Sequence, residues 1–339
     1  MNGPLKGKCA SYLVGLLCSL TVGAYALDVS YFGAVKSARY AQTTSTAPVL
    51  LASNAFAFTA FAISTNGMLT NATVKPPNTT PTRTLTSDTN RTSWQYEELF
   101  NTQAALDAAY PSANANPFQT FPYTFTLDTV NDGPRTASPY YFVTLFGTPT
   151  TPQITNLLSA QAVDTTCDLT LRWSPSGGSL DIVQLSVLDA GSNVVFTSPL
   201  PFSTGALSGA SSACTVPANM LPPGTNLTGH LTFGKPHFPD TNSYPGAFGV
   251  VALARDTAFP IVTRPAPVRP LLTPKMLTGG ACQLTFTGES NRFYHLQATT
   301  NWLTWLELFV TNLPGTQGSF TDSEAAGLNR RFYRLQVGP

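Results

Sequence analysis

The chain has 339 residues, of which 42% are hydrophobic and only 10% are charged, and its formal net charge is +1. This length suffices for about two or three domains, each with its own hydrophobic core. A nearly neutral chain lacks the basic surface that nucleic acid or an anionic membrane requires, so we expect neither partner. Solvation must come from abundant Thr, Ser, Asn and Gln side chains, which favour strands over long helices.

Residues 1–26 have the pattern of a secretory signal peptide. Lys6 and Lys8 precede a short apolar run, and Ala24-Tyr25-Ala26 supplies the small residues of a cleavage site before Leu27. Cleavage removes both lysines and leaves 16 basic against 17 acidic residues. The alternative, an uncleaved anchor, is disfavoured by the shortness of the apolar run, and no later segment is apolar enough to span a membrane.

Residues 27–150 predict an N-terminal β-sandwich-like domain. Apolar runs alternate with turn-forming clusters such as Asn131-Asp-Gly-Pro134, which we interpret as a hairpin turn rather than a calcium loop. One helix is expected over Thr102–Tyr110, because its Ala-rich centre favours helix and Pro111 would end it. The expected strands cover residues 55–64, 72–75, 82–87, 94–100, 123–130 and 140–146.

Residues 151–263 predict a second β-sandwich, because short alternating strands recur with regular turn signals. Leu169, Leu171 and Trp173 share one face of an early strand, and Leu221-Pro-Pro-Gly-Thr225 forms a bend before a late strand. On these residues the segment resembles immunoglobulin-like and fibronectin type III-like modules. It departs from them at Leu227, where that family usually has a Tyr whose hydroxyl ties down the bend. The resemblance implies a fold and no function.

The resemblance also implies a disulfide between Cys167 and Cys214. In that fold their strands are neighbours in one sheet, and both residues have the parity of inward-facing positions. Closing the loop between them would stabilise the fold by roughly 4 kcal/mol on the chain-entropy model. The alternative is a pair of buried free thiols. Either way, Cys282 is left without a partner within the exported chain.

A proline-rich linker over residues 264–279 is expected to lead to a small β-module over residues 280–339. Two near-copies of one alternating strand bracket the module, Arg292-Phe-Tyr-His-Leu-Gln297 and Arg331-Phe-Tyr-Arg-Leu-Gln336. With Trp302 and Trp305 between them, the segment resembles a small β-module found at the C-terminal end of many secreted bacterial proteins. The resemblance implies export rather than a particular activity.

The sequence contains no pattern that predicts catalysis, a cofactor or a metal site. His230, His237 and His295 lie away from any candidate nucleophile and from metal-ligand spacing, and we expect them at the surface. Glu97 and Glu98 are neighbours on one strand, so they point to opposite faces and cannot form the facing carboxylate pair of a glycosidase. We therefore expect a protein that is not an enzyme.

Aromatic side chains are the candidate binding residues, since a flat ring complements the apolar face of a sugar. Trp94 and Tyr96 share one face of their strand and predict a glycan-stacking platform, with core packing as the alternative. Outward residues of the last module form a second candidate, an interaction patch of Phe293, His295, Phe332 and Arg334. Ordinary cross-strand pairing is the alternative for this patch.

These observations predict a secreted or cell-surface, all-β protein of tandem β-sandwich modules that binds or adheres without catalysis. Its partners would be glycans or surface proteins, and the N-terminal domain is the expected glycan reader. The alternative is a structural or self-assembling component of the envelope or extracellular space, whose partners are copies of itself. An exposed apolar face or an open sheet edge, rather than an aromatic groove, would favour that alternative.

Overall fold

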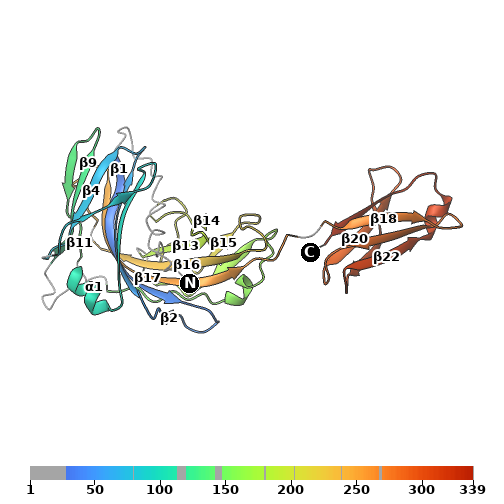
Figure 1. Ribbon diagram of the computed structural model, residues 1–339, viewed down its shortest axis with the longest axis horizontal. Coiled ribbons are helices and arrows are strands. Elements are labelled where there is room, and N and C mark those ends of the chain that lie inside the picture. The colour runs from blue at the N-terminus through green and yellow to red at the C-terminus, as the bar shows by residue number, and fades with distance from the viewer. Residues whose placement is uncertain are drawn as a thin grey trace, which may run out of the picture. The chain divides into compact units, whose positions relative to one another are not determined.

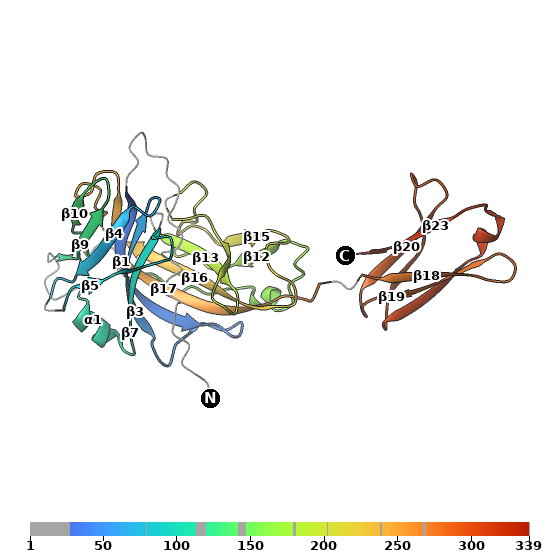
Figure 2. The ribbon, with the colours of Figure 1, turned by 45° about the horizontal axis from the view of Figure 1, so that its top comes forward.

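The computed structural model describes residues 28–78, 80–112, 120–141, 147–178, 181–201, 203–237, 239–266 and 269–338. Within these ranges the protein is all-β, as predicted, with a single seven-residue α-helix and short 3-10 turns. The chain divides into two compact units, one up to Arg264 and one from Pro265 onwards. Figures 1 and 2 show the strands of the first unit in blue to orange and those of the second in orange to red.

A nine-stranded sheet forms the frame of the first unit. Its order is β14-β13-β16-β17-β1-β3-β7-β6, and β2 pairs with β1 off this path. β1 and β17 run parallel, whereas the other neighbouring strands run antiparallel. The strands are β1 (Val29–Ala41), β2 (Val49–Leu50), β3 (Phe56–Ser64), β6 (Thr86–Ser87), β7 (Ser93–Phe100), β13 (Ile182–Leu188), β14 (Val194–Thr197), β16 (Asn226–Pro236) and β17 (Phe248–Val262).

The parallel pairing of β1 with β17 joins segments that the sequence assigns to different domains. The register runs from Tyr31 opposite Phe248 to Ala41 opposite Ala258. The predicted boundary between residues 150 and 151 therefore lies inside one compact unit. Period-two alternation identifies strands but not their partners, which explains why the local pattern indicates two domains where the structure has one continuous sheet.

The first core lies between part of this sheet, a smaller four-stranded sheet and helix α1. Phe58 of β3 stacks on Tyr110 at the end of α1, with ring centroids 3.6 Å apart and an interplanar angle of 3°. The smaller sheet has the order β10-β9-β4-β5, and a separate pair of short strands is formed by β8 and β11. These elements are β4 (Leu69–Lys75), β5 (Arg83–Thr84), α1 (Gln103–Ala109), β8 (Phe121–Pro122), β9 (Thr124–Thr129), β10 (Pro134–Ala137) and β11 (Tyr140–Tyr141).

Helix α1 confirms the helix predicted from the sequence. It begins after Thr102, whose hydroxyl accepts a hydrogen bond from the backbone N–H of Ala105 at 3.2 Å. This is the usual role of Thr at the position before a helix. The helix ends at Ala109, two residues before Pro111, which cannot continue it.

A second core lies further along the same face of the nine-stranded sheet. Val251 belongs to the first core and Phe259 to the second, and their even spacing on β17 places both side chains on one face. Trp173, predicted to face inward, is only 3% exposed in this core. The covering elements are η2 (Leu157–Ala160), β12 (Leu169–Arg172) and β15 (Ala213–Val216).

Two histidines are buried, contrary to the surface positions predicted for them. His230 is 5% exposed and His237 is 1% exposed. His230 Nδ1 lies 2.8 Å from Asp256 Oδ2, and Thr232 Oγ1 donates to Asp256 Oδ1 at 2.8 Å. Strand parity correctly places His230 on the face opposite Leu231. The face of the sheet that carries His230 is also buried at this position, so strand parity alone did not predict whether His230 is exposed.

The predicted disulfide between Cys167 and Cys214 is absent. Both residues are free thiols, and Cys282 is a third, buried one. β12 and β15 do pair, but their register sets Cys214 opposite Leu171. Cys167 precedes β12 by two residues and lies in a turn, where its backbone N–H donates to the carbonyl of Asp164 at 3.1 Å, so it is not the cross-strand partner of Cys214 that the short Cα separation of a disulfide requires. The prediction was wrong because parity fixes the face of a residue and not its register.

The second unit is a small sandwich of two three-stranded sheets, with orders β18-β19-β22 and β21-β20-β23. Leu284 and Phe286 of the first sheet and Tyr294 and Leu296 of the second are buried in its interior. The elements are β18 (Leu271–Met276), β19 (Cys282–Thr287), β20 (Phe293–Thr299), β21 (Leu306–Asn312), β22 (Gln317–Asp322), η3 (Ser323–Gly327) and β23 (Phe332–Val337).

The two near-copies seen in the sequence are β20 and β23, and they lie side by side. They pair antiparallel, from Tyr294 opposite Val337 to Thr299 opposite Phe332. The expected linker over residues 264–279 is shorter than predicted, because Leu271–Met276 forms β18 and pairs with β19. The linker was predicted to include Pro274 because prolines are frequent in linkers, but Pro274 lies within β18. A proline is tolerated in this strand because it lies at the edge of its sheet.

We predict that Gly229→Ala destabilises the first unit. Gly229 on β16 lies under the ring of Phe259, and an added Cβ would be 2.3 Å from Phe259 Cζ. Overpacking of this kind should lower the free energy of unfolding by about 1–3 kcal/mol, measured by urea denaturation. Gly234→Ala on the same strand is the control, since its Cβ would meet Ile182 at an ordinary 3.4 Å. Equal stability of the two variants would contradict this account.

We also predict three reactive thiols in the chain from Leu27 onwards. Cys214 lies opposite Leu171 and Cys167 lies before β12, so the two thiols are free and not joined to one another. Alkylation of the denatured, unreduced protein should therefore add three groups, counted by intact mass. Addition of a single group would show that two of the cysteines are joined.

Candidate functional site

Trp94 and Tyr96 do not form the predicted glycan platform. Trp94 is 7% exposed, packs in the first core and donates from Nε1 to the carbonyl of Arg91 at 3.3 Å. Tyr96 is half-buried, and its hydroxyl donates to Glu98 Oε2 at 2.6 Å. Core packing, the alternative weighed for this pair, describes Trp94, so no flat indole face is offered to a sugar here.

Glu98 is the centre of a polar cluster at the edge of the first core. Besides Tyr96, Tyr110 donates to Glu98 Oε2 at 2.7 Å and Arg83 Nη2 donates at 3.0 Å. Burial of the carboxyl group opposes its ionisation, but these donors outweigh burial and lower the pKa of Glu98. A carboxylate held ionised by three donors on one oxygen ties β5, β7 and the end of α1 together.

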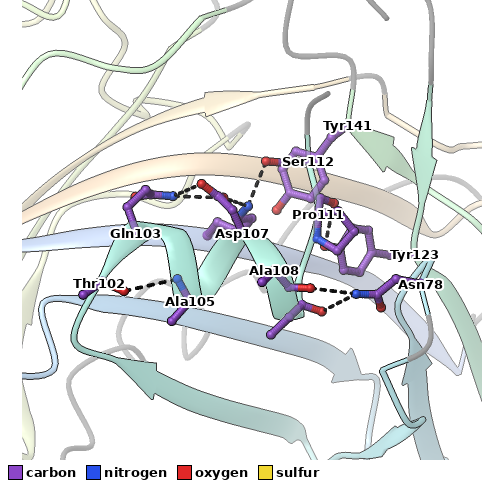
Figure 3. Close-up of polar contacts among 12 residues, drawn as sticks. Asn78, Thr102, Gln103, Ala105, Asp107, Ala108, Pro111, Ser112, Tyr123 and Tyr141 are labelled. Atoms are coloured by element: carbon purple, nitrogen blue, oxygen red, sulfur yellow. Dashed lines mark hydrogen bonds and ion pairs between the residues drawn. The ribbon is translucent and has the colours of Figure 1, made fainter. Parts of the chain in front are cut away.

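Lys36 is a buried cation at the contact between β1 and α1. Its side chain is 2% exposed, and its ammonium group forms an ion pair with Asp107 and donates to Ser112 Oγ at 2.8 Å. Gln103 Nε2 also donates to both oxygens of Asp107, each at 3.0 Å. Figure 3 shows Gln103 and Asp107 turned toward one another on α1, with Ser112 close by. Burial lowers the pKa of Lys36, and the carboxylate of Asp107 partly opposes that shift.

A neutral lysine beside a serine can act as a general base, but the contacts of Lys36 favour its charged form, which cannot accept a proton. A lysine base must be neutral to accept the hydroxyl proton. Asp107 stabilises the charged ammonium, which donates to Ser112 instead. The contacts around Lys36 therefore anchor helix α1 on β1. Asn78 holds the other end of the helix by donating to the carbonyls of Ala108 and Ala109 at 2.9 and 3.1 Å (Figure 3).

A cavity of about 380 Å³ opens beside this ion pair. Its apolar lining includes Phe56, Leu106 and Leu253, and Arg255 lines another part of it. Arg255 Nη1 donates to Thr151 Oγ1 at 2.8 Å, and its guanidinium lies 6.0 Å from the ring centroid of Tyr40. Since the cations of the cavity are already engaged by protein groups, the cavity alone indicates no ligand.

The second unit has an exposed tryptophan, whereas the tryptophans of the first unit are buried. Trp302 is 61% exposed and Leu303 is 85% exposed. Trp302 adopts a left-handed backbone conformation, with φ of 63°, which costs free energy for a residue with a bulky side chain. The backbone N–H of Trp302 donates to Thr299 Oγ1 at 3.1 Å, and Asn301 Oδ1 accepts from the N–H groups of Leu303 and Thr304 at 2.9 and 3.0 Å.

Three aromatic rings and one guanidinium group meet at this loop. Trp302 lies 4.2 Å from Phe332 and 5.9 Å from Trp305, measured between ring centroids. The guanidinium of Arg334 lies 4.1 Å from the centroid of Trp305, and its Nε donates to Gln297 at 2.8 Å. We call this group, Trp302, Trp305, Phe332 and Arg334, the aromatic surface. Neighbouring groups hold this surface in place: Thr299 and Asn301 hydrogen-bond to the loop, and Gln297 accepts a hydrogen bond from Arg334.

The structure brings together part of the predicted interaction patch. Phe332 and Arg334 belong to the aromatic surface. His295 is engaged nearby, with Nδ1 2.6 Å from Glu307 Oε2. Phe293 is 47% exposed but lies six positions from the residue opposite Phe332, about 20 Å along β20. The sequence interpretation omitted Trp302 and Trp305 from the patch, although two tryptophans so close together in a polar segment were the available signal.

Two properties bear on other kinds of site. Among the described ranges, no group of three or more His, Cys, Asp or Glu side chains is placed to hold a metal ion. Across those same residues, helices fall short of the length and hydrophobicity needed to cross a bilayer.

Comparison with known proteins gives no family assignment. No family model matches the chain, and no curated protein matches it. Matching solved structures include the FN1–FN3 domains of chicken CNTN1, with 8% identity over 91% of this chain and 93% of that chain and a TM-score of 0.27. A tetra-tandem repeat of a large adhesion protein covers 91% of this chain and 74% of its own, with 10% identity and a TM-score of 0.19. The match to a marsupial T cell receptor covers 91% of this chain and 100% of that chain, with 8% identity and a TM-score of 0.23. Scores this low support no inference about function.

The Lys36–Asp107 pair generates a prediction about stability. Asp107→Asn leaves the buried ammonium without its counterion, so the free energy of unfolding should fall by about 2–3 kcal/mol. The pKa of Lys36 should fall further, so the unfolded chain binds more protons and stability should rise more steeply between pH 7 and 10 than in the wild type. The double variant Lys36→Met/Asp107→Asn removes both charges and should recover most of the loss. Urea denaturation across this pH range measures both effects, and identical curves for all three proteins would contradict the assignment.

Proposed function

We propose that this chain is an exported, non-catalytic binding protein whose second unit attaches to polysaccharide through the aromatic surface. The observation that carries the proposal is the exposed ring of Trp302, fixed beside Trp305 and Phe332. Aromatic rings offer a large apolar area with few rotatable bonds, so little entropy is lost when they contact a ligand. The signal-peptide pattern of residues 1–26 is consistent with a partner outside the cell.

The rigidity of the loop supports a binding role. A left-handed tryptophan is unfavourable on its own, and the hydrogen bonds of Thr299 and Asn301 stabilise it. Strained residues held in place by their surroundings cluster at functional sites. The loop is thus arranged for contact before any ligand arrives, which lowers the entropic cost of binding. The proposed glycan-binding residues therefore lie in the second unit and not in the first, where Trp94 is buried.

Self-assembly is a second candidate function, favoured by a different observation. Leu303 and Leu306 extend the exposed apolar area beside Trp302, and the edge strand β18 exposes Leu271 and Met276. Exposed apolar patches and open edges are features of protein interfaces. However, β18 also carries a proline and a lysine, both of which hinder edge-to-edge pairing. We therefore place polysaccharide binding first.

Affinity gel electrophoresis tests the proposal. The exported chain, residues 27–339, would be run in native gels containing xyloglucan, galactomannan, hydroxyethyl cellulose or polygalacturonate. We expect retention in at least one gel, and Trp302→Ala should weaken that binding at least tenfold, about 1.4 kcal/mol, as expected for a central aromatic anchor.

Phe293→Ala is the matched control, since Phe293 is exposed on the same module but distant from the loop. It should bind like the wild type. Free mobility in every gel would contradict the proposal. Concentration-dependent sedimentation that Leu303→Ser abolishes would instead favour self-assembly.

A further inference from the structure

We infer that the polysaccharide recognised by the aromatic surface is acidic, with uronic-acid carboxylates that Arg334 binds. This inference rests on the proposed polysaccharide-binding function and specifies its ligand class.

Arg334 differs from Arg292 and Arg331 in having no carboxylate partner among the described residues. Arg292 Nε pairs with Glu289 at 2.8 Å, and Arg331 Nε pairs with Asp322 at 2.9 Å. Arg334 instead stacks on Trp305 and donates from Nε to the uncharged amide of Gln297. Its positive charge is therefore not neutralised by the module itself.

The contacts of Arg334 leave its terminal nitrogens available to a ligand. Nε is the nitrogen that Gln297 engages, and the stacked ring of Trp305 covers one face of the guanidinium. The two terminal nitrogens form the fork that binds a carboxylate through two parallel hydrogen bonds. Because the side chain is already held in place, little of its rotamer entropy remains to be lost on binding.

The acidic group closest in the strand register does not cancel this charge. Glu307 lies opposite Gln297 on β21, one strand beyond the strand that neighbours Arg334. The backbones of Glu307 and Arg334 are thus two strand spacings apart, about 10 Å. Its carboxylate is engaged by His295 at 2.6 Å. The aromatic surface thus presents rings for the apolar face of a sugar and one uncompensated cation for its acidic group.

Two forms of one polymer isolate the charge from the sugar ring. Polygalacturonate and its fully methyl-esterified form have the same backbone, and only the first carries carboxylates. In affinity gels, the wild-type chain should bind polygalacturonate about tenfold more tightly than the ester, since esterification removes the negative charge that the guanidinium of Arg334 would pair with through two parallel hydrogen bonds. Arg334→Gln should bind both polymers equally, at the affinity of the ester.

The outcomes separate this inference from the proposed function. If the wild type binds both polymers equally and Trp302→Ala weakens both, polysaccharide binding stands and the acidic ligand is wrong. If neither polymer nor any neutral polysaccharide is bound, the proposed function itself fails.

A second variant and a salt series guard against a merely structural effect. Arg334→Lys keeps the charge without the fork and should retain part of the preference for polygalacturonate. High salt should reduce the preference in the wild type but leave binding of the ester unchanged. A preference that persists in Arg334→Gln would overturn the role of Arg334. Equal melting temperatures of the three proteins would show that the module remains folded.

Discussion

The first unit depends on the parallel ladder between β1 and β17. The first core cannot be completed by residues 28–150 alone, because Tyr244, Ala247 and Val251 come from the later segment. The ladder also sets the position of Lys36, which lies opposite Leu253, and thereby the position at which α1 docks on the sheet. Contacts between distant parts of the sequence form slowly during folding, so this ladder is expected to complete the unit late.

The two units use tryptophan in opposite ways. Trp94 and Trp173 are buried, each in one core of the first unit, where they contribute apolar area to stability. Trp302 is exposed, and its backbone is held by a hydrogen bond to Thr299 rather than by packing of its ring in a core. A folded chain gains nothing in stability from exposing so large an apolar ring, whereas a binding surface gains contact area. That contrast, rather than any overall likeness to other proteins, is the basis for proposing that the second unit binds a ligand.

The sequence predicted local features well and long-range geometry poorly. Alternation located β20 and β23, and an Ala-rich run with a following Pro located α1, because these signals act over a few residues. The partner of β1, the register that separates Cys167 from Cys214, and the burial of His230 depend on strands distant in sequence. At the candidate site, Phe332 and Arg334 were found from strand parity. Trp302 was missed because its exposure depends on a left-handed turn.

The direction of β1 relative to β17 has a mechanical consequence. β1 lies at the first described residues of the first unit and β17 lies near its last residue, Arg264, and the two strands run parallel. A force applied between the start of β1 and the end of β17 pulls the strands in opposite directions along their own axes. The hydrogen bonds between them are then strained together in shear, rather than opened one after another. If the chain is held at both ends during attachment, the first unit should resist stretching most strongly at this ladder.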